Sequence, residues 1–463
     1  MIIDFLLANF SAKRDKDALV WRDQPYAYSW MEEAVKVWAK RLEERHVMAS
    51  SVVSLEADFS PNAVALLLAL IERRCIIVPL TRSMETSKAE FRTIAEVEST
   101  IKLDDQDRVS IENLPRSASH ELLLRLKDNH RPGLVLFSSG STGKSKAAVH
   151  DFVPLLDKFK VPRHAWRTMT FLMFDHIGGV NTLLYTLSNG GCAVATEDRS
   201  PRGVCRAIEK HKIELLPTSP TFLHLLIISE AYKHFDLSSL KLVTYGTEVM
   251  PEATLKRFHS LFPQLQLLQT YGLSELGILR SQSKSSGSLW FKVGGEGFEI
   301  RVVNGILEIK AKSAMLGYLN APTPFTSDGW FNTGDVVDVD GEYLRILGRE
   351  SEIINVGGEK VYPAEVESVI QQMEGVADVA VAAERNLVTG QIVKARVKLN
   401  TDESLADFRK RMRNFCRPRL PAFKIPQKVT LDNQDFYGER FKKLRREAQS
   451  AEPLNREKQP GPD

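Results

Sequence analysis

The sequence has few of the features that mark secreted or zinc-stabilised proteins. Its 463 residues include only four cysteines, and no two of them form a C-x-x-C pair: Cys75, Cys192, Cys205 and Cys416. A disulfide framework and a zinc site are therefore not expected, and a reducing compartment suits the chain. The formal net charge is only +3, so the composition also argues against a nucleic-acid-binding protein.

Long hydrophobic runs are missing as well. The longest covers residues 63–71 and ends at Glu72-Arg73-Arg74, so it is too short to cross a bilayer and is typical of a buried helix. The N-terminal segment MIIDFLLANF has no basic stretch and carries Asp4 among its apolar residues, unlike a signal peptide. We therefore expect a cytoplasmic protein without a membrane span.

What the sequence does contain is an alternation of apolar, β-branched stretches with amphipathic helical patterns. This alternation predicts an α/β fold with parallel sheets and crossover helices. The predicted strands are Ser51–Leu55, Cys75–Val78, Gly133–Ser138, Thr168–Phe174, Cys192–Thr196, Glu214–Thr218, Lys241–Thr244 and Gln266–Gln269. The predicted helices are Ala63–Arg74, Pro201–His211, Ser219–Ile228 and Pro251–Phe262.

The pattern changes at about residue 295. Short strands at Glu299–Val303 and Ile306–Ile309, with Asp-Gly turns, predict a small antiparallel, β-barrel-like region. After Gly348-Arg349, a helix beginning at Pro363 and further strands predict a small, mobile α+β domain. We therefore divide the chain into a large N-terminal domain (1–349), a hinge (350–351), a small C-terminal domain (352–446) and a polar tail expected to be disordered (447–463).

A glycine-rich segment, S-S-G-S-T-G-K-S-K at residues 138–146, follows the apolar strand G-L-V-L-F. Small residues let backbone N–H groups turn toward an anion, while the hydroxyls add donors and the lysines add charge. A Walker loop would need glycine where the sequence has Ser138, and no other nucleotide-kinase signature follows. A flexible Gly/Ser turn is the alternative to a phosphate-binding loop.

The segment F-S-S-G-S-T-G-K-S-K instead resembles the signature loop of the adenylate-forming superfamily, which includes acyl-CoA synthetases, aryl ligases, luciferases and peptide-synthetase adenylation domains. Its three mild departures are Ser138, Ser145 and Ala147. The resemblance implies that the loop closes over the β- and γ-phosphates of ATP. The implied phosphate-binding residues are Ser138, Ser139, Gly140, Ser141, Thr142, Gly143 and Lys146.

Further motifs of the superfamily follow this loop in order, and the resemblance as a whole extends from about residue 10 to residue 446. Y-G-T-E at 245–248 resembles the segment that lines the adenine pocket. In T-Y-G-L-S-E at 270–275, the resemblance implies that Tyr271 stacks on adenine, Ser274 meets the α-phosphate and Glu275 binds Mg²⁺. G-W-F-N-T-G-D at 329–335 implies a ribose-binding carboxylate. The implied nucleotide-binding residues are Gly246, Thr247, Glu248, Tyr271, Gly272, Asp335 and Arg349.

The longest similar stretch, residues 347–367, implies two features of the second reaction step. Ser351 lies at the hinge position, where the superfamily usually has Asp or Lys, and a permissive backbone suffices there. Gly357 and Gly358 correspond to the loop that, in the superfamily, borders the tunnel of the thiol substrate.

The superfamily's catalytic lysine lies in [ST]-G-K-[IV]-x-R, and the chain offers F-Y-G-E-R-F-K-K-L-R-R at 436–446. Aligning the glycine places Glu439 at the lysine position, whereas aligning K-x-x-R places Lys442 there, with Lys443 as the next candidate. We favour Lys442, because adenylate formation needs a mobile cation on the developing charge. A basic surface helix is the alternative.

The acid pocket carries a mixed signal. The segment F-L-M-F-D-H-I-G-G at 171–179 contains the H-x-x-G of acyl and aryl members, as His176 and Gly179, and the F-D of amino-acid-activating members, as Phe174-Asp175. Asp175 therefore either meets a substrate amine or caps the following helix. The other implied pocket residues are small to medium in size and suit an aromatic or medium-sized acid: Thr218, Ser219, Gly246 and Leu273.

The resemblance implies a two-step ligase. A carboxylic acid attacks Mg·ATP to form an acyl-adenylate and pyrophosphate, and the acyl group then passes to CoA or to the phosphopantetheine of a carrier protein. Two alternatives stay open. One is an adenylate-forming enzyme with another substrate or acceptor, such as an amide ligase, an amino-acid-activating enzyme or a nitrite-adenylating diazotase. The other is a degenerate nucleotide-binding protein.

Overall fold

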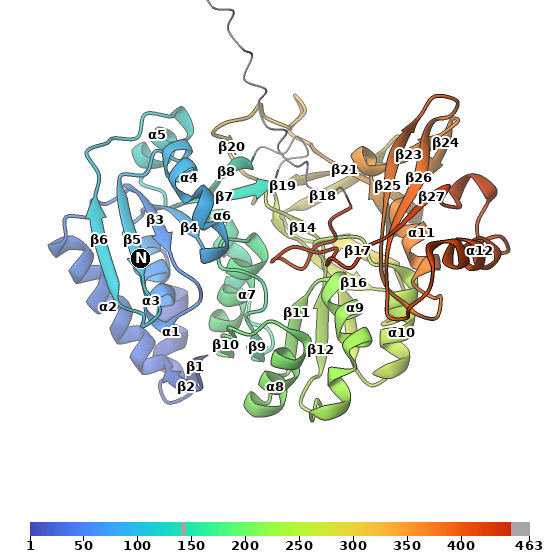
Figure 1. Cartoon of the computed structure of the whole chain (residues 1–463). Coiled ribbons are helices and arrows are strands. Elements are labelled where there is room, and N and C mark those ends of the chain that lie inside the picture. Colours follow the sequence, from blue (N-terminus) through green and yellow to red (C-terminus); the bar gives the residue numbers. More distant parts are fainter. Residues whose placement is uncertain (140–144, 446–463) are drawn as a thin grey trace, which may run out of the picture. The chain divides into compact units, whose positions relative to one another are not determined.

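The computed structural model describes residues 1–139 and 145–445 (Figure 1). Of the predicted loop residues, Gly140, Ser141, Thr142 and Gly143 lie outside this described part, as does the predicted tail at 447–463. The chain forms two compact units. The large unit holds Met1–Ile353 together with Glu439–Lys442, and the small unit holds Ile354–Gly438 and the described residues from Lys443 onward.

The first sheet of the large unit has seven strands, and its central pairings are parallel, as predicted. A β-hairpin at the edge, formed by β1 and β2, adds the only antiparallel pairing described in this sheet. In sheet order the strands are β13 (Gln266–Gln269), β12 (Leu242–Tyr245), β11 (Leu215–Thr218), β9 (Arg167–Met169), β10 (Cys192–Val194), β1 (Asp17–Trp21) and β2 (Gln24–Ala27). Strand β9 is shorter than predicted, since residues 170–174 leave the sheet.

The register of this sheet aligns three strand ends. Thr218 pairs with Tyr245 on β12, and Tyr245 pairs with Gln269 on β13. Because the carboxyl ends of parallel strands meet at one edge, the segments that follow these strands gather there. Those segments begin with Ser219, Gly246 and Thr270.

The second seven-stranded sheet combines a parallel centre with antiparallel edges. Strands β7 and β8 flank residues 140–144 and pair antiparallel, with Ser138 opposite Lys146. In sheet order the strands are β20 (Gly317–Tyr318), β8 (Ser145–Asp151), β7 (Gly133–Ser139), β4 (Ile76–Leu80), β3 (Val52–Glu56), β5 (Ser99–Leu103) and β6 (Val109–Asn113).

Helices connect the strands of both sheets. The predicted hydrophobic run lies in α3, where residues 63–71 are all buried. Serine followed by proline begins three helices, where Ser60, Ser200 and Ser219 each accept a backbone N–H bond as the N-cap. The helices are α1 (Asp4–Ala12), α2 (Tyr28–Glu44), α3 (Pro61–Glu72), α4 (Lys88–Ile94), α5 (Glu121–Asp128), α6 (Phe152–Asp157), α7 (Ile177–Ser188), α8 (Pro201–His211), α9 (Pro220–Ser229) and α10 (Glu252–Leu261).

The predicted antiparallel region is a six-stranded sheet whose described pairings are all antiparallel. It begins at Arg280, earlier than the composition indicated. Its strands in sheet order are β16 (Arg280–Ser283), β17 (Phe291–Gly294), β22 (Tyr343–Arg349), β21 (Phe331–Asp340), β19 (Ile306–Ala311) and β18 (Phe298–Val303), and a short ribbon of β14 (Gly272–Leu273) and β15 (Gly277–Ile278) precedes them.

The small unit is an α+β structure with its own hydrophobic core. Its first helix begins at Pro363, as predicted, because proline at the first helical turn sacrifices no internal hydrogen bond. Its elements are β23 (Ile354–Val356), β24 (Glu359–Val361), α11 (Pro363–Ile370), β25 (Val376–Asn386), β26 (Gly390–Leu399), α12 (Leu405–Cys416) and β27 (Lys428–Leu431). Among the described helices of the whole chain, none is long and apolar enough to cross a membrane.

Candidate nucleotide and acid site

The turn after β12 is built around Gly246. A Cβ at this position would come within 2.7 Å of the Thr270 carbonyl oxygen, so the two strand ends can approach this closely only with glycine here. The next residue, Thr247, has φ of +73°, an uncommon conformation for a β-branched side chain. Such backbone strain gathers at functional sites, which agrees with the predicted role of this turn.

Asp335 lies between Tyr271 and Arg349. The Tyr271 hydroxyl donates to Asp335 Oδ2 at 2.6 Å, and Arg349 Nε donates to Oδ1 at 3.2 Å. Asp335 and Arg349 also face each other in the register of β21 and β22. Burial raises the pKa of Asp335, while the Arg349 charge opposes the shift. The structure thus brings the predicted ribose and adenine residues together.

Tyr271 itself is packed into the core of the antiparallel region and is 5% exposed. Its predicted role of stacking on adenine would need an accessible ring face. In the structure the Tyr271 ring packs among buried side chains of this core, and its hydroxyl donates to Asp335. The stacking role therefore stays a prediction.

Glu275 is tied to the end of the glycine-rich segment through a residue that the sequence patterns did not single out. Tyr318 donates from its hydroxyl to Glu275 Oε1 at 2.6 Å. The Lys146 ammonium lies 5.2 Å from the centre of the Tyr318 ring. The pairing of β20 with β8 brings Tyr318 beside the strand that carries Lys146, and a backbone hydrogen bond from Met315 to Glu275 joins the third segment. These contacts are long-range, so no local pattern could have indicated Tyr318.

Ser274, which precedes Glu275 in the sequence, contacts a histidine of strand β8. Its carbonyl oxygen is 2.5 Å from His150 Nε2, and burial lowers the pKa of His150, so this imidazole is neutral. No group of three or more His, Cys, Asp or Glu side chains within the described ranges is arranged as a metal site. A single carboxylate such as Glu275 suits Mg²⁺, which is usually shared with substrate phosphates.

The two candidate lysines lie in different surroundings. Lys442 belongs to the large unit, where the carboxylates of Glu248 and Glu275 act on its charge. Burial lowers the pKa of Lys442, Arg440 and Arg349 lower it further, and the two carboxylates oppose this. Lys443 belongs to the small unit and pairs there with buried Asp378.

The helix-capping alternative for Asp175 is wrong, because His176 is the N-cap of α7. The His176 Nδ1 atom accepts from the Gly178 backbone N–H at 3.0 Å, which leaves the proton on Nε2. Burial, with Lys442 and Arg440 close by, lowers the pKa of His176 well below its usual range, so the ring is neutral.

Asp175 is instead part of an ion pair. Its Oδ2 accepts from Arg440 Nη2 at 3.1 Å and from the Thr81 hydroxyl at 2.9 Å, and the residue is 4% exposed. Gly179 has a packing role, since a Cβ there would lie 1.9 Å from the Met173 carbonyl oxygen.

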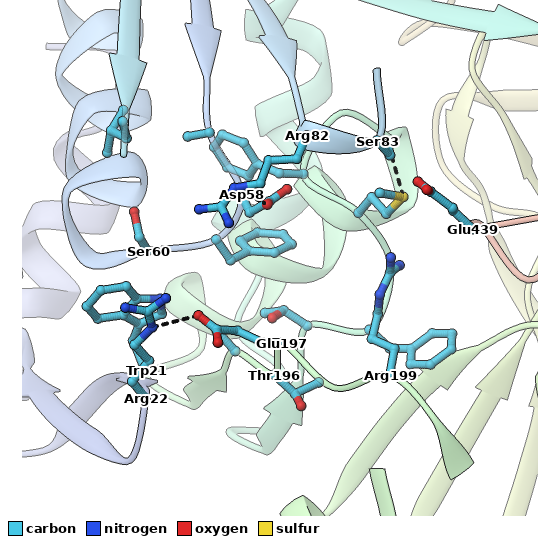
Figure 2. Close-up of a pocket in the computed structure, with 18 of the residues that line it drawn as sticks. Trp21, Arg22, Asp58, Ser60, Arg82, Ser83, Thr196, Glu197, Arg199 and Glu439 are labelled. Atoms are coloured by element: carbon cyan, nitrogen blue, oxygen red, sulfur yellow. Dashed lines mark hydrogen bonds and ion pairs between the residues drawn. The ribbon is translucent and has the colours of Figure 1, made fainter. Parts of the chain in front are cut away.

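Two pockets adjoin this region of the large unit. A small one of about 10 Å³ is lined by side chains from the predicted acid segment, the Thr247 turn and the lysine segment: Phe171, Leu172, Met173, His176, Arg199, Thr247, Arg440 and Lys442. A larger cavity of about 630 Å³ shares Phe171, Met173 and Arg199 with it. Figure 2 shows Arg82 and Asp58 on one wall of the larger cavity, with Arg199 and Glu439 on another.

The other predicted acid-pocket residues lie at neighbouring strand ends. Thr218 ends β11, Ser219 is the N-cap of α9, and Leu273 lies in β14. None of the three lines either of these two pockets. The cavity residues Arg82 and Arg199 carried no motif that could have identified them from the sequence.

The remaining predicted residues concern the second step. Ser351 lies in a short 3₁₀ turn, Glu350–Glu352, next to the division between the units. Gly357 and Gly358 form the turn between β23 and β24, with φ of +61° and +95°, and a Cβ at either would meet nothing within 4 Å. The hinge and tunnel roles stay predictions.

Comparison with known proteins identifies the family. The profile of the AMP-binding enzyme family matches residues 7–289, and that of the AMP-binding enzyme C-terminal domain matches residues 365–434. The chain belongs to the AMP-binding enzyme family. The adenylate-forming motifs and the order in which they occur are thereby accounted for.

Relatives of this AMP-binding enzyme include CoA ligases. It is 31% identical over 313 residues to a 3-[(3aS,4S,7aS)-7a-methyl-1,5-dioxo-octahydro-1H-inden-4-yl]propanoyl:CoA ligase of Mycobacterium tuberculosis, covering 62% of each chain. It is 25% identical to the indoleacetate–CoA ligase of Aromatoleum aromaticum, covering 89% of this chain and 91% of that one. An anthranilate CoA ligase in complex with anthranoyl-AMP shares the fold, with a TM-score of 0.80, 20% identity and coverage of 96% and 95%.

Proposed function

We propose that this AMP-binding enzyme is an acid–thiol ligase, which converts a carboxylic acid and ATP into an acyl-adenylate and pyrophosphate and then transfers the acyl group to the thiol of CoA, with release of AMP. One observation carries the proposal. Lys442 lines one pocket of the large unit together with His176 of the predicted acid segment and Thr247 of the Y-G-T-E motif. The charges of Glu248, Glu275 and Arg349, from three separate nucleotide motifs, act on it as well.

The cations of this region suit the adenylation half-reaction, in which negative charge builds up between the acid carboxylate and the α-phosphate. Lys442 and Arg349 supply positive charge, and the neutral His176 presents its Nε2 proton as a donor. Fixed charges and donors stabilise a transition state most where water is excluded. Mg²⁺ held by Glu275 would neutralise phosphate charge when bound.

The same charges indicate the kind of acid. The residues that line the small pocket include three cations and no carboxylate. One of the cations, Arg440, is paired with Asp175, and the other two are Arg199 and Lys442. This surplus of positive charge favours a carboxylate substrate and disfavours an α-ammonium group, so we propose an acid other than an α-amino acid. The aromatic and bulky acids in the names of the relatives support an aromatic or medium-sized acid.

In the thioester half-reaction, Lys442 must leave the site so that the thiol can enter it. We propose that the small unit turns about Ser351 and that the Gly357–Gly358 turn then borders the incoming thiol. The relatives' names support CoA as the acceptor, and a carrier-protein phosphopantetheine is the alternative acceptor.

The test is acid-dependent ATP–pyrophosphate exchange with indole-3-acetate, anthranilate, benzoate, octanoate and a mixture of α-amino acids. We expect exchange with one or more of the non-amino acids, and a large fall of that exchange, to a residual rate, in Lys442→Ala. Adding CoA, or a holo-carrier protein in parallel, identifies the acceptor by thioester formation. MgATP binding without exchange for any acid would favour a degenerate nucleotide-binding protein instead.

A further inference from the structure

Residues Glu439–Lys442 differ from their sequence neighbours in the compact unit to which they belong. They belong to the large unit, whereas Gly438 and Lys443 on either side belong to the small unit. The two residues before Lys442 stand where the superfamily motif has Ser or Thr followed by Gly. Here they are Arg440 and Phe441, which are large and able to make specific contacts.

Phe441 has the backbone conformation that glycine adopts most easily. Its φ is +50°, in the left-handed region that bulky residues rarely occupy. The surrounding structure holds it there through side chain and backbone. The ring lies 5.2 Å from that of Phe171 and 5.5 Å from that of Phe222, and the Phe441 carbonyl oxygen accepts from the Ser219 hydroxyl at 2.6 Å. A strained residue persists only where such contacts over-determine it.

Arg440 provides a second attachment. Its pairing with Asp175 joins residues 265 positions apart, and Thr81 fixes the same carboxylate oxygen. Asp175 is almost fully buried, so removing Arg440 would leave this carboxylate without its ion-pair partner. Two consecutive residues are thus anchored to different parts of the large unit directly before Lys442.

We propose that Arg440 and Asp175, together with Phe441, form a latch that positions Lys442 for adenylate formation. The latch residues are positioning residues, since they act through Lys442. The inference rests on the proposed function, in which Lys442 serves the adenylation half-reaction and leaves before thioester formation. Breaking the latch therefore slows the first half-reaction and spares the second.

The kinetic test compares Arg440→Gln, Asp175→Asn and the double variant with the wild type. With the most active acid of the panel, we expect each single variant to slow ATP–pyrophosphate exchange about ten- to hundredfold, the size of a misplaced catalytic group. The double variant should be no slower than the slower single variant, because both changes remove one interaction. Arg440→Lys should restore part of the rate. Transfer from the preformed adenylate of the same acid to CoA should stay within about twofold.

A structural readout tests the latch without any acid. Hydrogen–deuterium exchange of the full chain, followed on peptides covering residues 436–445, should increase in both Arg440→Gln and Asp175→Asn. Asp236→Asn, which breaks an exposed ion pair with Lys212 elsewhere in the large unit, is the matched control and should leave those peptides unchanged.

Three results would overturn the latch. They are unchanged deuterium uptake at residues 436–445 in Asp175→Asn, an equal fall of both half-reactions in the single variants, and multiplied effects in the double variant. Absence of acid-dependent exchange in the wild type would instead overturn the proposed function, and the deuterium uptake would still decide whether the pair holds this segment.

Discussion

The Tyr271 hydroxyl donates a 2.6 Å hydrogen bond to Asp335, across 64 residues of sequence. This bond and the Arg349 pairing hold a buried carboxylate whose pKa burial would otherwise raise further. The bond joins a residue of the predicted adenine motif to a residue of the predicted ribose motif. Its removal should therefore affect both the stability of the protein and ATP binding.

Tyr271→Phe keeps the buried ring and removes this donor. We expect the free energy of unfolding to fall by about 1–3 kcal/mol, because a buried acceptor loses its partner, and ATP binding to weaken. Thermal unfolding and calorimetric titration with ATP measure the two effects. Tyr343→Phe, on strand β22, is the matched control, since its ring keeps the contacts with Lys284 and Lys292. An unchanged ATP affinity in Tyr271→Phe would separate the bond from nucleotide binding.

Tyr318 offers a test of the Lys146–Glu275 connection. Tyr318→Phe removes the hydrogen bond to Glu275 and keeps the ring beneath Lys146, whereas Tyr318→Leu removes both. Losing one hydrogen bond to a charged group, worth about 1.5–3 kcal/mol, should raise KM for MgATP, and Tyr318→Leu should raise it more. Steady-state kinetics at varied Mg²⁺ concentration measure KM for MgATP in each variant. Equal KM values in Tyr318→Phe and Tyr318→Leu would exclude a contribution from the Lys146 contact.

The lowered pKa of Lys442 predicts the alkaline limit of adenylate formation. The lysine must be protonated to stabilise negative charge, and it loses its proton at a lower pH than an ordinary lysine. We therefore expect the exchange rate to fall as pH rises through a value below the usual lysine range, and Lys442→Ala to lack this limb. A limb that persists in Lys442→Ala would assign it to another group.

Gly246→Ala tests the close approach of two strand ends. The added Cβ would meet the Thr270 carbonyl oxygen at 2.7 Å, so the turn must shift, and we expect a loss of about 1–3 kcal/mol in the free energy of unfolding. Gly287→Ala is the control, because its Cβ would meet only the His259 ring, at 3.1 Å. Urea unfolding of both variants measures the difference, and equal losses would show that Gly246 has no special steric role.

Local patterns predicted much of the fold because each depends on residues close in sequence. Strand β13 and helix α8 have the predicted bounds, and the helix at Pro363 begins where proline allows it. The family resemblance likewise implied site residues at Thr218, Gly246 and Tyr271, which lie at or just after the ends of β11, β12 and β13. Asp175 was harder to interpret, since Asp and the following His are both able to cap α7 and only the backbone geometry selects His176.

The sequence by itself therefore determined the α/β class, the adenylate-forming motifs and the choice of Lys442 as the candidate lysine. Only the tertiary structure decided that Tyr318 reaches Glu275, that Lys443 pairs with Asp378, and that Asp175 pairs with Arg440. The physical reason is distance along the chain. Propensity and periodicity act over a few residues, whereas an ion pair between positions 175 and 440 forms only when the fold has brought them together.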